Sequence, residues 1–154
     1  MAVDLTAEVR NALAEELEEL CVSVHEIAEP LPERQLWAKP VEPGNSIGHL
    51  ILHLTGNLNH FVGAQLGGTG YVRDREREFT ESQPPSKSEL LTNLDRAVAT
   101  FRRVVENLPA DRLVETHPHA KFGSVLKALV HLVAHFALHR GQMSYIVRLA
   151  NPGG

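Results

Sequence analysis

Hydrophobic residues recur at intervals of three and four along four stretches of this chain, which is the spacing of one face of an α-helix. These stretches cover residues 4–28, 45–66, 86–108 and 121–150. Side chains that suit helix N-caps stand at their starts: Asp4, Asn45 or Ser46, Ser86 and Ser124. The pattern therefore predicts an all-α protein built from four amphipathic helices.

The connection between the second and third helices is long. Residues 67–87, GGTGYVRDREREFTESQPPSK, contain too much glycine, charge and proline for a core segment. Arginine alternates with acidic residues in RDRERE, for which we expect solvent-exposed ion pairs of small energetic value. We predict a four-helix bundle with a long crossover loop between helices 2 and 3, forming a single domain over residues 1–154.

Three histidines of the fourth helix, His131, His135 and His139, follow one another at intervals of four. On a helical wheel His135 and His139 lie on the shoulder of the apolar face, whereas His131 lies further round. We expect His135 and His139 to point into the bundle, and His131 to support them or to contact another subunit. In the alternative reading, the pair is half-buried, satisfied by hydrogen bonds, and binds nothing.

The second helix carries histidines on one flank of its apolar face. His53 lies nearest to the core, and Asn57, one turn later, is placed to orient it or to line the same cavity. We interpret His49 and His60 as solvent-exposed or as subunit-contact residues. In the linker before the fourth helix, His117 and His119 flank a proline and are expected to be exposed.

Facing helices of a bundle are where metal sites are assembled. His53, His135 and His139 would supply three imidazoles and leave a coordination position open, as in catalytic rather than closed structural sites. We predict that these three residues bind one divalent metal. Cys21, in the first helix without a basic partner, is interpreted as a small core residue.

Composition excludes several classes of binding partner and indicates the cellular compartment. The formal charge of −4 and the lack of a Lys/Arg cluster interleaved with aromatics argue against nucleic acid and against an acidic membrane surface. A single cysteine excludes an internal disulfide, and the N-terminal residues lack the pattern of a secretory signal. No apolar run reaches the roughly 18 residues of a membrane span, so we expect a cytoplasmic protein.

Three segments carry a family resemblance. SIGHLILHLTGN, RDREREF and above all HFALHRGQ, which matches the pattern HxxxHxGQ, resemble the DinB-like superfamily of four-helix metalloproteins. That superfamily includes bacterial low-molecular-weight thiol transferases and mycothiol-dependent maleylpyruvate isomerases. The resemblance covers nearly the whole chain and places the family's metal triad on His53, His135 and His139. It implies a divalent metal, commonly zinc or nickel, and frequently a homodimer.

Three functions are compatible with such a site. The first is a metal-dependent thiol S-transferase that activates a small thiol cofactor for attack on an electrophilic small molecule. Its candidate assisting residues are Arg140 and Gln142 for catalysis and Asn57, Arg73 and Arg140 for cofactor binding. The second is a metal-dependent hydrolase, which is weakened because no glutamate accompanies the histidines as in HExxH. The third is a non-catalytic metal-binding or stress-associated dimer.

The homodimer has a second argument in the residues themselves. Leu52 and Leu66 lie away from the core sector of the second helix, where they would be exposed aliphatic side chains on a monomer. We therefore expect them to contact a second copy of the chain.

Overall fold

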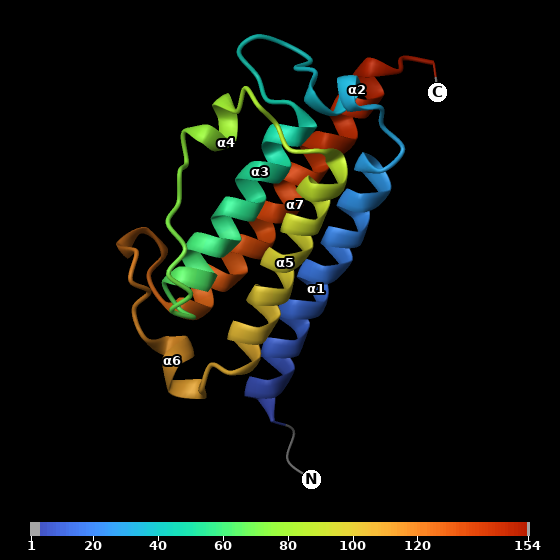
Figure 1. Cartoon of the computed structure of the whole chain (residues 1–154). Helices are drawn as coiled ribbons and strands as arrows, with labels where there is room; N and C mark the ends of the chain where they lie inside the picture. Colours follow the sequence, from blue (N-terminus) through green and yellow to red (C-terminus); the bar gives the residue numbers. More distant parts are fainter. Residues whose placement is uncertain (1–3, 154) are drawn as a thin grey trace.

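The computed structural model describes residues 4–153, and in them four long helices form a bundle (Figure 1). The long helices are α1 (Leu5–Ala28), α3 (Ile47–Leu58), α5 (Lys87–Glu106) and α7 (Val125–Ala150). Short helical turns connect them: α2 (Glu33–Trp37), α4 (Arg77–Thr80), α6 (Ala110–Val114) and the 3₁₀ turn η2 (Ala120–Phe122). The predicted all-α four-helix bundle is confirmed.

The direction of the helices explains the long connection. α1 and α7 run one way and α3 and α5 the other, so the crossover after α3 must return along the outside of the bundle before α5 begins (Figure 1). Each long helix packs against two others: α1 against α5 and α7, and α3 against the same two. The result is that α3 and α7 are antiparallel neighbours, with the crossover and its helix α4 beside α3.

The predicted N-caps set where the long helices begin. Asp4 Oδ1 accepts from the backbone N–H of Thr6, and the hydroxyls of Ser46, Ser86 and Ser124 accept from the N–H three residues on. Each such cap is worth about 1 kcal/mol, because it satisfies a donor that the helix itself leaves unpaired. At the start of α3, Ser46 rather than Asn45 is the cap.

An aliphatic core with two central phenylalanines fills the bundle. Leu17, Leu54, Phe101 and Phe136, one from each long helix, are almost completely buried. Burial of each such side chain contributes about 1.5–3 kcal/mol. Trp37 closes one end of the core over α3, because Gly48 has no side chain and its Cα leaves room for the indole.

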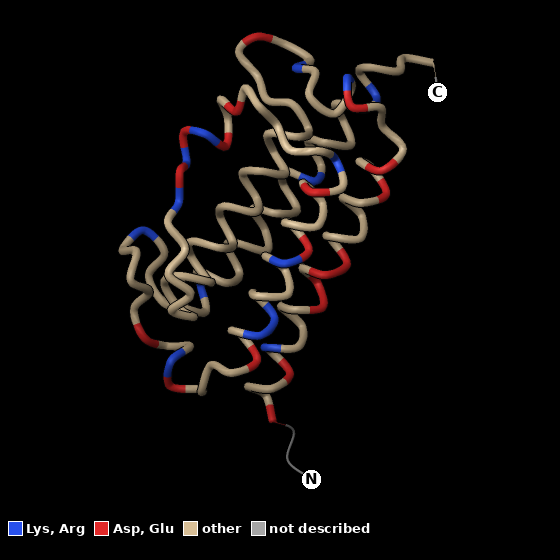
Figure 2. The backbone as a smooth tube through the Cα atoms, in the orientation of Figure 1, with Lys and Arg blue, Asp and Glu red and all other residues tan. Residues whose placement is uncertain are grey.

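The end of α3 departs from regular α-helix. Residues Asn59–Ala64 form a π-helical turn, η1, that continues the second predicted helix. π-Helical turns are frequent beside functional sites. Figure 2 shows basic and acidic positions alternating along the crossover as it returns beside α3 toward α4. Within residues 4–153, no helix combines the length and the apolar composition that a membrane crossing requires.

Candidate metal centre

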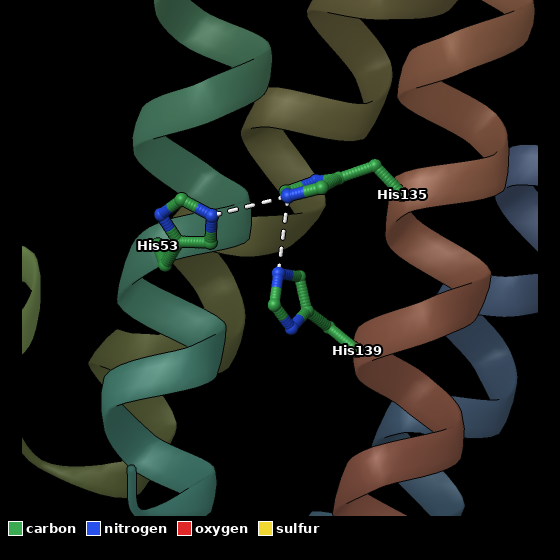
Figure 3. Close-up of side chains that lie close together, drawn as sticks. All are labelled: His53, His135 and His139. Carbon is green, nitrogen blue, oxygen red and sulfur yellow. Dashed lines mark hydrogen bonds between the residues drawn. The ribbon is translucent and has the colours of Figure 1, made fainter. Parts of the chain in front are cut away.

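Three imidazoles converge between α3 and α7 (Figure 3). His53 comes from the middle of α3, and His135 and His139 come from successive turns of α7. His135 Nε2 lies 3.3 Å from His53 Nε2 and 3.0 Å from His139 Nε2. The structure therefore brings together the three residues that the sequence analysis selected.

The spacing of these nitrogens suits a metal ion. In a tetrahedral zinc site, metal–nitrogen bonds of about 2.0–2.1 Å place neighbouring ligand nitrogens about 3.3 Å apart. The two measured distances lie close to that value. A cation at the centre would engage all three lone pairs at once, whereas N–H···N hydrogen bonds within the cluster cannot.

Hydrogen bonds on the outer side of two imidazoles fix their tautomer. His53 Nδ1 donates to Glu78 Oε2 at 2.9 Å, and His139 Nδ1 donates to Gln142 Oε1 at 2.7 Å. Both partners are oxygen acceptors, so each Nδ1 carries the proton and each Nε2 keeps a free lone pair. Histidine ligands of metals are generally oriented in this way.

The third imidazole has an amide on its outer side. Asn57 Nδ2 lies 2.9 Å from His135 Nδ1, while the buried Asn57 Oδ1 has no hydrogen-bond partner within the described chain. Rotation of the amide by 180° would turn Oδ1 toward His135 Nδ1 and satisfy it. The protonated Nδ1 that this requires is the tautomer in which His135 Nε2 ligates a metal. The unpartnered Asn57 oxygen is therefore consistent with the His135 tautomer that binds a metal.

The carboxylate behind His53 comes from the crossover. Glu78 is 6% exposed and forms a two-pronged ion pair with Arg73, at 2.7 Å from Nε to Oε1 and 2.8 Å from Nη2 to Oε2. Burial alone would raise the pKa of Glu78, but the hydrogen bonds from Arg73 and His53 lower it. A Cβ on Gly56 would lie 2.1 Å from Glu78 Oε1, so glycine at this position lets the carboxylate reach α3.

Sequence analysis missed Glu78. The expectation that the charges of RDRERE form solvent-exposed ion pairs was wrong for Arg73 and Glu78, since both side chains are largely buried. A signal was available in Gly56, one turn after His53 on α3, because a glycine there removes the side chain that would keep another segment away.

The site favours neutral imidazoles. Burial, together with the neighbouring His139 and His53, lowers the pKa of His135 to about 3. Burial also lowers the pKa of His139, against the raising effect of its bond to Gln142. Both residues therefore stay unprotonated, as metal ligands must be, at pH values where free imidazole is charged.

The other residues proposed for the site divide into two groups. Asn57, Gln142 and Arg73 adjoin the histidines, although each acts through another side chain: Asn57 on His135, Gln142 on His139 and Arg73 on Glu78. Arg140 instead donates from Nε to Ser23 Oγ at 2.7 Å, which directs it to α1 and away from the space between α3 and α7.

The structure corrects several expectations for the remaining histidines. His117 is buried rather than exposed, because its Nε2 donates to the carbonyl of Phe61 at 3.0 Å. His49 is also buried, packed edge-on against Trp37 with Nδ1 2.6 Å from Ser46 Oγ. His60 is half-buried, His119 is exposed as expected, and His131 is exposed with its ring stacked near His135.

A cationic rim, formed by Lys121 and Lys127, adjoins the triad on the side of His131. Lys121 Nζ lies 4.5 Å from the ring centre of Phe61 and 4.7 Å from that of Phe122. Burial, Arg73 and Arg75 lower the pKa of Lys121. Lys121, Phe122, Lys127 and His131 line a surface hollow one helical turn from His135. Sequence analysis did not single out Lys121, whose role depends on where η2 packs.

Comparison with known proteins identifies the family and the fold of the chain. The family described as mycothiol-S-transferase matches residues 12–150 of the chain. Among solved structures, one similar chain is YfiT from Bacillus subtilis, described as a probable metal-dependent hydrolase with an unusual four-helix bundle topology. The two are 19% identical, the match covers 90% of this chain and 86% of that one, and the TM-score is 0.72. At this identity the likeness establishes the fold. No curated protein matches the chain.

Proposed function

This chain belongs to the mycothiol-S-transferase family, and on that premise we propose that it is a metal-dependent thiol S-transferase. The sequence resemblance to DinB-like thiol transferases is thereby confirmed at the level of the family. In the proposed centre, His53, His135 and His139 hold one divalent cation, zinc or nickel. This proposal rests on one observation: the Nε2 atoms of the three histidines converge, and each Nδ1 atom, on the other side of its ring, faces a polar side chain.

A bound divalent cation supplies the positive charge that lowers the pKa of a coordinated thiol and stabilises its thiolate. The chain's own residues prepare that chemistry. Glu78, held by Arg73, keeps the proton of His53 on Nδ1, and Gln142 does the same for His139. The lowered pKa values of His135 and His139 keep their Nε2 atoms unprotonated.

The nucleophilic thiol must come from outside the chain. Cys21, the one cysteine, lies on α1 facing α5, whereas the triad lies between α3 and α7. Burial, followed by the negative charge of Asp95, raises the pKa of the Cys21 thiol to about 12. A low-molecular-weight thiol therefore serves as the nucleophile in our proposal.

The surroundings of the triad favour a transferase over the two alternatives. A site plugged by side chains would favour a non-catalytic protein, but His135 and His139 are only half-buried. A hydrolase needs a free general base, and Glu78 is occupied by Arg73 and His53. The cationic rim formed by Lys121 and Lys127 suits a thiol that carries an anionic group.

The test is a thiol-consumption assay. Protein loaded with Zn²⁺ or Ni²⁺ is incubated with mycothiol, bacillithiol, glutathione or coenzyme A and an aryl halide electrophile. We expect metal-dependent formation of the thioether with at least one thiol, and loss of this activity in His135→Ala. An intact metal site that accelerates none of the four reactions would support the non-catalytic reading.

We also propose a homodimer, with a different interface from the one first expected. Leu52 and Leu66 are half-buried against the core, so they are not the exposed pair that the helical wheel suggested. Exposed apolar side chains instead lie along α7, where Leu138, Tyr145 and Leu149 line a groove. Sedimentation of the wild type and of Tyr145→Glu tests whether this groove holds two chains together.

A further inference from the structure

A second group of potential metal ligands lies on the opposite side of the bundle from the triad, between α1 and α5. Cys21 and His25 are one turn apart on α1, and Asp95 faces them from α5. Asp95 Oδ1 is 2.7 Å from His25 Nε2 and 3.6 Å from Cys21 Sγ. Cys21 has no basic hydrogen-bond partner, as expected, but His25 and Asp95 place their potential ligand atoms within 4.8 Å of its sulfur.

We propose that Cys21, His25 and Asp95 form a second divalent-cation site, suited to Zn²⁺, that links α1 to α5. One thiolate, one imidazole and one carboxylate are a donor set that zinc accepts. This site is independent of the proposed triad and of its activity.

The distances fit a tetrahedral zinc site with little movement. Bond lengths of about 2.3 Å to sulfur and about 2.1 Å to nitrogen or oxygen place S and O about 3.6 Å apart and N and O about 3.4 Å apart. The S···O distance already has this value, and the N···O distance must widen by about 0.7 Å. Because the side chain of Asp95 is 53% exposed, it is free to make this adjustment.

The outer side of the imidazole is also arranged as for a metal ligand. His25 Nδ1 donates to Glu29 Oε1 at 2.8 Å, as His53 Nδ1 does to Glu78, so Nε2 is the ring nitrogen that faces the cluster. Nε2 lies 2.7 Å from Asp95 Oδ1, and a bound cation would take the place of the proton between them. Glu18 adds a further negative charge beside Cys21, although Arg102 pairs with it. The carboxylates around the cluster thus attract a cation.

Access to the cluster is open. A surface hollow lined by Glu18, Val22 and Val98 leads to the three donor side chains. Protein ligands would occupy three positions, and the fourth would face this hollow and hold water or a small external ligand. Bound to the folded state alone, the ion would stabilise the packing of α1 on α5.

Cobalt substitution tests the site without relying on activity. Cys21 is the only cysteine in the chain, so a thiolate-to-Co²⁺ charge-transfer band in the near ultraviolet reports on this cluster alone. We expect the band to appear on titration of the full-length apoprotein with Co²⁺, at one equivalent per chain in His135→Ala. Zn²⁺ added afterwards should remove the band.

Three further variants decide the outcome. Cys21→Ser must abolish the band, and His25→Ala and Asp95→Asn must each weaken Co²⁺ binding at least tenfold while the chain keeps its helical circular dichroism. His25 and Asp95 are partly exposed, so these variants remain informative if Cys21→Ser does not fold. Absence of the band in folded His135→Ala would show that the cluster is only an ion pair of protonated His25. A band that is unchanged in His25→Ala would show that Co²⁺ binds the thiol without the other two ligands. Either result overturns the proposal.

Discussion

Glu78 Oε2 lies 2.9 Å from His53 Nδ1, on the side of the imidazole opposite the Nε2 that faces His135. Glu78, a residue of the crossover, therefore orients His53, a residue of the long helix α3. The carboxylate fixes the tautomer of His53, and Arg73 fixes the carboxylate.

Glu78→Gln should weaken metal binding about 10- to 100-fold, the usual cost of removing an outer carboxylate from a histidine ligand. The amide has nearly the same shape but loses the charge that Arg73 and His53 share. The measurement is a competition titration with a chromophoric chelator. Glu76→Gln, an exposed change two residues earlier, is the matched control and should bind as the wild type does. An equal loss of metal affinity in the two variants would show that the effect comes only from the net charge of the crossover.

His135→Ala should remove stoichiometric metal, because the imidazole that contacts both other histidines is lost. Elemental analysis after dialysis against Zn²⁺ measures this, in a Cys21→Ser background so that only the triad is counted. Circular dichroism should remain helical. His131→Ala, one turn earlier on the same helix and exposed, should keep its metal. Retention of a full equivalent in His135→Ala would rule out the triad.

Gly56→Ala should lower both metal affinity and thermal stability, because its Cβ would lie 2.1 Å from Glu78 Oε1. Overpacking of this kind costs about 1–3 kcal/mol, which exceeds the gain of about 1 kcal/mol from replacing glycine by alanine in a helix. Gly141→Ala on α7 is the control. Its Cβ would meet no atom within 4 Å, so it should raise the melting temperature. A Gly56→Ala protein as stable as the wild type would mean that Glu78 is easily displaced.

The metal-free protein should lose stability as the pH falls from about 6.5 toward about 3. The unfolded chain protonates His135 near the ordinary pKa of about 6.5, whereas burial, His139 and His53 hold the pKa of the folded state at about 3. Between these values the unfolded state binds more protons, so the free energy of unfolding decreases with falling pH, and above about pH 7.5 the effect is absent.

Urea unfolding in the presence of a chelator, at about pH 7.5 and about pH 5, measures this effect. His135→Gln removes the titrating group and should lose less stability over the same interval than the wild type. An equal loss of unfolding free energy in the two proteins would contradict the lowered pKa of His135.

Lys121→Gln should raise KM for an anionic thiol about two- to fivefold, equivalent to roughly 0.5–1 kcal/mol for a partly exposed charge. The value of kcat and the metal content should stay unchanged, since Lys121 borders the hollow next to the triad without contacting its nitrogens. Lys39→Gln, an exposed change in the connection before α3, is the control. If added salt leaves KM of the wild type unchanged, the rim does not contribute through charge.

The hydrophobic periodicity determined the four long helices, and cap residues such as Ser46 and Ser124 determined where they begin. Helical phase also selected His53, His135 and His139, because an angle around one helix axis predicts which side chains face the interior. The same reasoning misjudged His49, which lies far round its helix from the core and is nevertheless buried under Trp37.

Tertiary packing alone decided the rest. Glu78 reaches His53 because the crossover folds back onto Gly56, and His117 is buried because its loop packs on Phe61. Cys21 and His25 meet Asp95 only because α1 and α5 are neighbours. Periodicity describes how each helix faces its own surroundings, but it carries no information about which other segment supplies those surroundings. Contacts between distant segments therefore require the folded structure.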